Sequence, residues 1–255
     1  MGTTGEANSF DTSERKAILE SVVNEKPDFN RILVGTGCCS ITESVELSRH
    51  ALQNGVNHVL ILPPFYYRNV SDEGLYQYFD QFIHKVNNPD LRIYLYHFPK
   101  MTGLPFSHDL IERLLADFPD QIEGIKDSSG DWDNMSTMLD RFPRFRVFAG
   151  SEVFLLDLLK KGGPGAISAS ANVTSLLAAD VYKNANNDNA EFLQEKLTLV
   201  RKMIEKSPMI PMLKLLMSQI EGDENWINIR PPLTPLSLWN ENEVNDILNH
   251  IRVPQ

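Results

Sequence analysis

The sequence predicts an α/β protein built as a TIM barrel, and two observations support this fold class. Short β-type runs alternate with helical patterns at intervals of about 20 to 35 residues, which is typical of repeated βα units around a parallel sheet. No Gly-x-Gly-x-x-Gly pattern follows the first strand, so the usual dinucleotide site of an open α/β sheet is missing and a barrel is favoured. In a barrel the chemistry lies at the carboxyl ends of the strands.

Six runs rich in β-branched and aromatic residues are predicted as strands. They are Arg31 to Gly37, His58 to Pro64, Arg92 to Pro99, Ile122 to Ser128, Phe145 to Gly150 and Gly165 to Ser170. A helical pattern follows each run, at Thr42 to Asn54, Asp72 to Val86, Ser107 to Phe118, Asn134 to Phe142, Val153 to Lys161 and Thr174 to Asn186. Thr42 is expected to cap the first of these helices.

Beyond Asn187 the strands stop and helical patterns remain, at Glu191 to Glu205, Pro211 to Ile220 and Glu241 to Ile251. No Gly/Ser linker, low-complexity tract or block of like charge divides the chain. We therefore expect residues 1–187 to form the barrel domain and residues 188–255 to form a helical extension packed on it.

Composition excludes several classes of function. The chain has 255 residues, of which 42% are apolar, so it can bury one sizeable core. Its net charge of −10 argues against nucleic acid and anionic membranes as partners, because both call for a basic surface. No stretch approaches the roughly 20 apolar residues of a membrane span, and the polar start Met1 to Glu6 has no signal-peptide h-region. We expect a cytoplasmic protein with a small-molecule substrate.

The cysteines and histidines point to no metal site. Cys38 and Cys39 are neighbours in sequence, so they cannot form a disulfide framework, and we interpret them as small packing residues rather than as a reactive or metal-binding thiol pair. The six histidines show no ligand spacing. A metal cofactor is therefore not predicted.

Lys126 is the first candidate catalytic residue, because it ends the otherwise apolar strand Gly124-Ile125-Lys126-Asp127. Strand alternation places its side chain on the opposite face from Ile125, and one of those faces lines the barrel. Enclosure there disfavours the ammonium form of a lysine and frees the amine to attack a carbonyl, as in Schiff-base chemistry. From the strand alone, a lysine that reaches out to solvent is the alternative.

Two further features suit the same chemistry. Tyr96 lies at the end of the preceding strand, where a phenol can shuttle protons beside an imine, although strand tyrosines are also common in cores and at rims. The turn Gly2-Thr3-Thr4-Gly5-Glu6 offers backbone N–H groups and two hydroxyls that could cradle a carboxylate. An ordinary βα loop is the alternative for this turn.

Six motifs in chain order also suggest a family. They are Gly2-Thr3-Thr4-Gly5-Glu6, Gly35-Thr36-Gly37, Pro64-Phe65-Tyr66, Tyr96 followed by Pro99 and Thr102-Gly103, Gly124-Ile125-Lys126-Asp127, and Gly165-Ala166-Ile167-Ser168. In order and spacing they resemble the dihydrodipicolinate synthase and N-acetylneuraminate lyase family. The likeness extends to Arg230-Pro231-Pro232-Leu233 and so covers nearly the whole chain.

The resemblance implies a TIM barrel with a C-terminal helical extension, a homo-oligomer (dimer or tetramer), and a pyruvate-like 2-oxo acid substrate. It implies no metal or organic cofactor, because the lysine itself forms the imine. The resemblance implies Lys126 as the imine-forming lysine, Tyr96 as the proton shuttle, and Thr3 and Thr4 as the carboxylate-binding turn and relay. It implies Tyr66 as a relay tyrosine that can reach a neighbouring subunit's site. It also implies Gly150 as the start of a substrate-facing loop and Ile167 as a residue lining the lysine pocket.

Two positions depart from known activities of that family. Dihydrodipicolinate synthases carry an arginine at the position of Met101 to hold the second substrate's carboxylate, and a thioether cannot replace a bidentate cation. Sialic-acid lyases carry an acidic residue at the position of Val153 to bind sugar hydroxyls. We therefore expect an aldolase or dehydratase acting on another 2-oxo acid, such as a 2-keto-3-deoxy sugar acid. The alternatives are a dihydrodipicolinate synthase and a catalytically impaired member with an interaction role.

The start of the chain departs from the family as well. The family supplies a strand, a helix and a second strand before the Gly-Thr-Thr-Gly-Glu turn, whereas Met1 stands directly before that turn here. Six strands are predicted where a TIM barrel has eight. We expect a barrel that lacks its first β-α-β segment, through either a start site further upstream or a true shortening.

Overall fold

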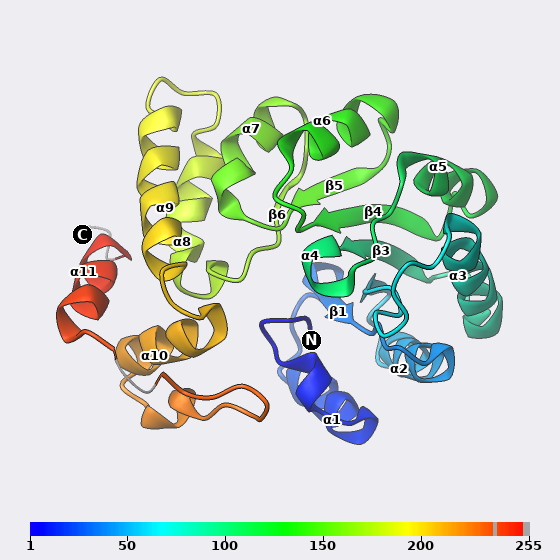
Figure 1. The fold of residues 1–255 in the computed structure, drawn as a ribbon, viewed down its shortest axis with the longest axis horizontal. Helices are drawn as coiled ribbons and strands as arrows, with labels where there is room; N and C mark the ends of the chain where they lie inside the picture. Colours follow the sequence, from blue (N-terminus) through cyan, green and yellow to red (C-terminus); the bar gives the residue numbers. More distant parts are fainter. Residues whose placement is uncertain (237–238, 252–255) are drawn as a thin grey trace. The chain divides into compact units, whose positions relative to one another are not determined.

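The computed structural model describes residues 1–236 and 239–251. The chain divides into two compact units, Met1–Val147 and Phe148–Gln255. Within the described residues helices follow each of six strands, and only helices follow β6 (Figure 1). Every strand pair with a described register is parallel. The prediction of a parallel α/β fold is confirmed at this level.

In the first unit four strands pair in chain order. They are β1 (Leu33–Gly35), β2 (His58–Ile61), β3 (Arg92–His97) and β4 (Ile122–Asp127). All four lie within the predicted runs but end earlier. The run from His58, for example, ends as a strand at Ile61, shortly before Pro63 and Pro64, and proline cannot donate a hydrogen bond to a sheet.

The helices of the first unit pack side by side. Helices α1, α2, α3 and α5 contact one another in that order along one side of the strands (Figure 1). Helix α3 buries an apolar face, on which Leu75, Phe79 and Phe82 are spaced four and three residues apart. The bounds are α1 (Thr12–Asn24), α2 (Ile41–Gln53), α3 (Asp72–Val86), α4 (Pro99–Thr102), α5 (His108–Asp117) and α6 (Trp132–Arg141), with 3-10 turns η1 (Ala7–Ser9) and η2 (Phe29–Arg31).

Two details of these helices differ from the sequence prediction. Helix α1 was not predicted, because only Arg15 and Leu19 are buried along it and its apolar period is weak. A signal was present in the capping box, in which the Asp11 carboxylate accepts the Glu14 N–H at 2.9 Å and the Glu14 carboxylate accepts the Asp11 N–H at 3.0 Å. The cap predicted for α2 was wrong, since Ser40 and not Thr42 occupies the N-cap position.

The second unit consists mainly of helices. Strand β5 (Arg146–Ala149) spans the boundary between the units and pairs in parallel with the short β6 (Gly165–Ala166). The helical elements are η3 (Glu152–Phe154), α7 (Leu155–Lys160), α8 (Ala171–Lys183), α9 (Ala190–Ile204), α10 (Met209–Glu221), η4 (Glu224–Ile227) and α11 (Glu241–Ile251). The helices predicted beyond Asn187 are therefore present in the structure.

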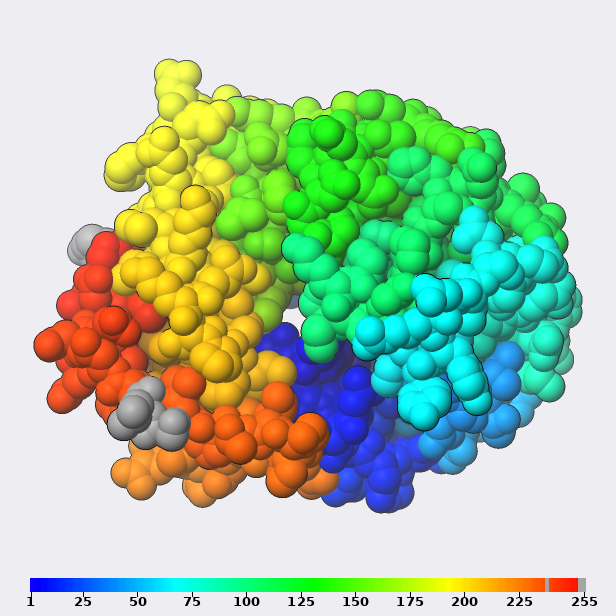
Figure 2. Space-filling view, in the orientation of Figure 1, coloured from blue at the N-terminus to red at the C-terminus, as the bar shows by residue number. Residues whose placement is uncertain are grey.

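One apolar core joins these helices. It includes Leu177 of α8, Leu197 and Val200 of α9, Leu216 of α10 and Ile247 of α11. The opposite side of α9 lies at the surface (Figure 2), where the side chains of Phe192 and Leu199 are exposed. None of the described helices is long and apolar enough to cross a membrane. The division into a barrel and an extension at residue 187, and a missing first β-α-β segment, stay predictions.

Gly124 provides a test of packing in the first unit. A Cβ atom at this position would lie 2.5 Å from the Arg146 carbonyl oxygen and 2.7 Å from the Tyr94 ring. Because such crowding forces the strand or the ring to move, Gly124→Ala is expected to lower the free energy of unfolding by about 1–3 kcal/mol, measured by urea denaturation. Gly74→Ala is the control, because the nearest atom to its new Cβ is 3.6 Å away and helix α3 tolerates alanine well. Equal stability of the two variants would contradict this account of the strand.

Candidate active site

Lys126 and Tyr96 face each other across neighbouring strands. They are register partners near the carboxyl ends of β4 and β3, so their side chains leave the sheet on the same face. The Lys126 Nζ donates a hydrogen bond to the Tyr96 hydroxyl at 3.0 Å and also lies 4.2 Å from the centre of the Tyr96 ring. Tyr96 itself is only 4% exposed. The structure thus brings an amine and a phenol within proton-transfer distance.

Thr3 extends this pair into a chain of three groups. Its Oγ1 lies 3.3 Å from the Tyr96 Oη. The Gly2–Glu6 turn holds Thr3 in place, because the Glu6 N–H donates to the Thr3 carbonyl at 3.0 Å and the Ala7 N–H donates to the Gly2 carbonyl at 3.2 Å. Thr4 lies in the same turn and is partly exposed. Since Lys126 donates to the phenol oxygen, the phenol hydrogen is available to Thr3.

The opposite face of the same strand ends is anchored by buried polar groups. His97 and Asp127 are the next register partners after Tyr96 and Lys126, and both are almost fully buried. The Phe106 N–H donates to His97 Nδ1 at 3.1 Å, and burial lowers the pKa of His97 despite the nearby Asp127 carboxylate. Asp127 accepts hydrogen bonds from the Asn134 amide at 2.6 Å and from the Ser129 N–H at 2.7 Å. These bonds hold both catalytic candidates on rigid strand ends.

Arg15 adds a positive charge that the sequence analysis missed. It lines a small cavity together with Thr3 and Tyr96. Its guanidinium is 5% exposed and donates to the Gly35 carbonyl at 2.8 Å and to the Cys38 sulfur at 3.0 Å, while its Nε has no hydrogen-bond partner among the described residues. A buried guanidinium beside two hydroxyls can attract an anionic group. Arg15 was missed together with helix α1.

Two predicted site residues lie at the surface. Tyr66, in the loop after β2, is 77% exposed and its ring packs edge-to-face on Tyr67, 5.4 Å between centres. Met101, on α4, is 59% exposed. Within the described residues, neither Tyr66 nor Met101 forms a hydrogen bond with Lys126. The Tyr66 side chain is free to contact another molecule, as the prediction of a role in a neighbouring subunit requires.

Gly150 and Ile167 belong to the second unit. Gly150 follows β5 and Ile167 follows β6 directly. The Ile167 N–H donates to the Ala149 carbonyl at 2.9 Å, so the two residues leave neighbouring strand ends together. Gly150 was predicted at the start of a loop, and it follows the end of β5. Ile167 was predicted within a strand from Gly165 to Ser170, which was wrong, because β6 ends at Ala166. The roles of both residues in substrate binding stay predictions.

The two cysteines differ from each other. Both are free thiols, and burial raises the pKa of the Cys38 thiol. Cys39 is exposed, so its interpretation as a packing residue was wrong. In residues 1–236 and 239–251 no group of three or more His, Cys, Asp or Glu side chains is arranged to hold a metal ion.

Several known proteins resemble this chain in sequence and in fold. The sequence profile of the dihydrodipicolinate synthetase family matches residues 1–251. An uncharacterized DapA-like lyase of Chloroflexus aurantiacus is 34% identical over 238 residues, which is 93% of this chain and 79% of that protein. The crystal structure of dihydrodipicolinate synthase from Agrobacterium tumefaciens superimposes with a TM-score of 0.86 at 32% identity, covering 98% of this chain and 84% of the other.

YagE of Escherichia coli K12 is a further relative. YagE is named a putative 2-dehydro-3-deoxy-D-gluconate aldolase. Its sequence is 33% identical to this chain over 187 residues, which is 72% of this chain and 60% of YagE. Its crystal structure in complex with pyruvate has a TM-score of 0.85 at 28% identity, covering 98% of this chain and 85% of the other. The α/β fold described above therefore matches that of solved family members, and related proteins are lyases and aldolases. The chain belongs to the dihydrodipicolinate synthetase family.

Proposed function

We propose that the protein is a Schiff-base-forming lyase that captures a small 2-oxo acid, such as pyruvate, on Lys126. The observation that carries the proposal is the 3.0 Å hydrogen bond from Lys126 Nζ to the Tyr96 hydroxyl, extended by Thr3 at 3.3 Å. This arrangement supplies a nucleophile, a proton shuttle and a relay within one unit. Membership of a family of lyases and aldolases supports the same chemistry.

The proposed reaction begins with imine formation on Lys126. The Lys126 amine attacks the ketone carbon, one amine proton and one proton from Tyr96 pass to the ketone oxygen, and that oxygen leaves as water, so a protonated imine remains. The imine withdraws electrons from the adjacent carbon, so a carbon–carbon bond can break or form there. Tyr96 moves the protons between nitrogen, oxygen and water, while Thr3 and Thr4 hold the carboxylate so that the ketone faces Lys126.

The other predicted residues and properties complete the proposal. Gly150 and Ile167 line the substrate site, and Tyr66 serves the relay in a neighbouring subunit of a homodimer or homotetramer. The exposure of the Tyr66 side chain supports a contact with a neighbouring subunit. The imine acts as the electron sink, so the chemistry needs no metal or organic cofactor. We also propose that the protein works in the cytoplasm.

Met101 favours a 2-keto-3-deoxy acid over other substrates. Its thioether lies at the surface on α4 and offers no charge to a second carboxylate. The relative named a putative 2-dehydro-3-deoxy-D-gluconate aldolase supports this substrate class. Dihydrodipicolinate synthesis from pyruvate and aspartate semialdehyde is the second candidate, favoured by the solved relative of that name. A catalytically impaired protein with an interaction role is the third.

Met101→Arg tests the choice between these substrates. We expect the wild-type protein to condense pyruvate with aspartate semialdehyde poorly, and we expect the arginine to raise kcat/KM for that reaction by about 10-fold or more, because a charge-assisted bond contributes roughly 1.5–3 kcal/mol. Met101→Leu is the control of similar volume without charge. Efficient condensation by the wild-type protein would show that another cation holds the carboxylate.

Imine trapping tests the proposed function itself. The protein is incubated with pyruvate and with a panel of 2-oxo acids, reduced with borohydride and weighed intact by mass spectrometry, while release of pyruvate from 2-keto-3-deoxy acids is followed in parallel. We expect one reduced adduct per chain with pyruvate and none without borohydride. No adduct with any 2-oxo acid would contradict the proposal and favour the catalytically impaired alternative.

A further inference from the structure

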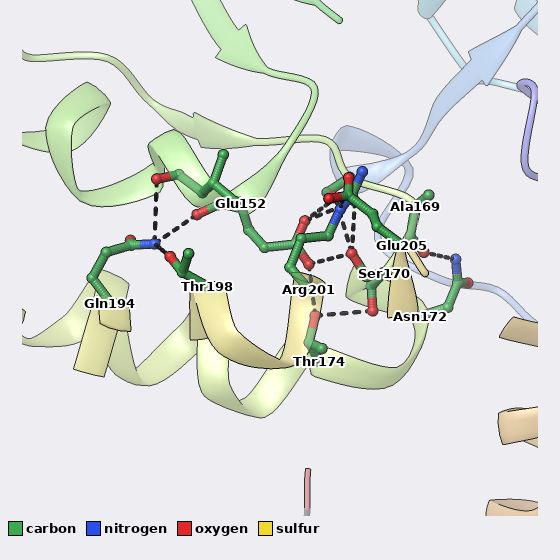
Figure 3. A network of polar contacts seen from close by, with 11 residues as sticks. Glu152, Ala169, Ser170, Asn172, Thr174, Gln194, Thr198, Arg201 and Glu205 are labelled. Atoms are coloured by element: carbon green, nitrogen blue, oxygen red, sulfur yellow. Dashed lines mark hydrogen bonds and ion pairs between the residues drawn. The ribbon is translucent and has the colours of Figure 1, made fainter. Parts of the chain in front are cut away.

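A buried polar network surrounds the Glu152 carboxylate in the second unit (Figure 3). Glu152 is 1% exposed. Its oxygens accept hydrogen bonds from Ser168, from Ser170 at 2.5 Å and from Thr174 at 2.9 Å, and they form an ion pair with Arg201 at 3.2 Å. Arg201 is itself 8% exposed. We call these five residues the Glu152 network.

The hydrogen bonds that join Arg201, the two serines and Glu152 have one direction. Arg201 Nη1 donates to the Ser168 hydroxyl at 2.9 Å and to the Ser170 hydroxyl at 2.7 Å, and both hydroxyls donate onward to Glu152. A guanidinium only donates and a carboxylate only accepts, so each hydroxyl has one possible orientation. A glutamine in place of Glu152 would set an amide N–H against these hydroxyl hydrogens.

Ser170 shows that the network takes precedence over local helix capping. It occupies the N-cap position of α8, where a serine side chain usually accepts a backbone N–H of the first turn. Ser170 makes no such bond, and its hydroxyl instead donates to Glu152 and accepts from Arg201. Thr174, in the first turn of α8, is directed to the same carboxylate.

Helix α9 holds Glu152 at two points. The Gln194 amide donates to the Glu152 carbonyl at 2.9 Å, and its oxygen accepts the Leu156 N–H at 3.0 Å. Arg201 lies about two helical turns further along α9, on the same face, and holds the carboxylate. The backbone and the side chain of Glu152 are therefore both fixed to one helix.

The network lies directly beyond two strand ends. Glu152 comes two residues after Gly150, which follows β5, and Ser168 comes one residue after Ile167, which follows β6. Ala149 and Ala166 are register partners at those ends. The Glu152 network thus ties the loop after β5 to the loop after β6, and ties both to α9.

We infer that Glu152 and Arg201 are positioning residues that hold these two loops in the arrangement that binds the 2-oxo acid. The inference rests on the proposed function, in which Gly150 and Ile167 line the substrate site. A role in stability alone would not need charges, because well-packed apolar residues often replace a buried ion pair without loss of stability. A fixed hydrogen-bond geometry between two loops is what apolar residues cannot supply.

The test compares thermal stability with affinity for pyruvate. The variants are Glu152→Gln, Arg201→Met and the apolar double variant Glu152→Leu with Arg201→Met. The control is Glu191→Gln. Glu191 lies on α9, as Arg201 does, and forms an exposed ion pair with Lys160 at the end of α7. The readouts are the midpoint of thermal unfolding and the pyruvate concentration that gives half-maximal borohydride trapping.

We expect each single variant to raise the half-maximal concentration roughly 10- to 100-fold, the scale of a small misplacement of a binding group, while trapping at saturation stays unchanged. The double variant leaves no unpaired charge, so it is expected to be more thermally stable than either single variant without regaining affinity. The control is expected to match the wild type in both. An unchanged half-maximal concentration in the single variants, or recovery of affinity together with stability in the double variant, would overturn the inference.

Hydrogen exchange separates this inference from the proposed function. If the wild-type protein forms no adduct, the proposed function has failed, and exchange of the backbone amides of residues 150–152 and 167–170 then decides about the loops. Faster exchange there in Arg201→Met than in Glu191→Gln supports their positioning by the network. Equal exchange in the two variants would overturn it.

Discussion

Lys126→Met is expected to lower turnover of the preferred 2-oxo acid by on the order of 10⁴-fold or more, because removal of a covalent nucleophile eliminates the pathway that depends on it. Methionine keeps the length of the side chain and most of its apolar contacts. The fold should therefore survive, and the loss should appear in kcat. The measurement is steady-state release of pyruvate, with thermal unfolding as the check on folding.

The control for this variant is Lys85→Met, which removes an exposed lysine from the end of α3. We expect wild-type turnover in the control. Substantial turnover by Lys126→Met, within about 100-fold of the wild type, would show that another group is the nucleophile and that the hydrogen bond with Tyr96 has a different purpose.

Tyr96→Phe is expected to slow turnover by about 100-fold or more, the usual scale for loss of a positioned acid–base group. Phenylalanine retains the ring and its stacking on Phe98, 5.8 Å between centres, so the core should remain packed. Only the hydroxyl that joins Lys126 to Thr3 is lost. The slowest step should become proton transfer, so the rate of imine formation after mixing with pyruvate should fall as well.

Tyr94→Phe is the matched control, because Tyr94 lies two residues earlier on the same strand and is buried to a similar degree. Its hydroxyl accepts a hydrogen bond from Arg146 at 3.2 Å and lies outside the chain from Lys126 to Thr3. We expect turnover within a few-fold of the wild type. Equal rates in Tyr96→Phe and the wild type would remove Tyr96 from the mechanism.

The strands were predictable from sequence because each is a short apolar or β-branched run that ends in turn-forming residues. Their ends were less predictable, as the early end of β2 at Ile61 shows, since strand length depends on pairing with neighbours as well as on propensity. Helix α1 escaped prediction because its apolar period is weak. Its capping box marks the start of a helix, but this signal does not depend on apolar periodicity.

Within the site, the pairing of Lys126 with Tyr96 was predictable, because both residues end neighbouring parallel strands. Arg15 and the Glu152 network were not. Arg15 reaches the cavity from an unpredicted helix, and Glu152 meets Arg201 across 49 residues of sequence, a contact that only tertiary packing creates. Charged residues are usually exposed, so nothing in the neighbouring sequence marks Arg15, Glu152 or Arg201 as buried.

The most direct test of the central claim is to locate the adduct. Wild-type protein is incubated with pyruvate, reduced with borohydride and digested, and the peptide that spans β4 is sequenced by mass spectrometry. The account predicts that the reduced pyruvate is attached to Lys126 and that the other lysines of the chain are unmodified. Attachment to a different lysine, with Lys126 recovered unmodified, would contradict it.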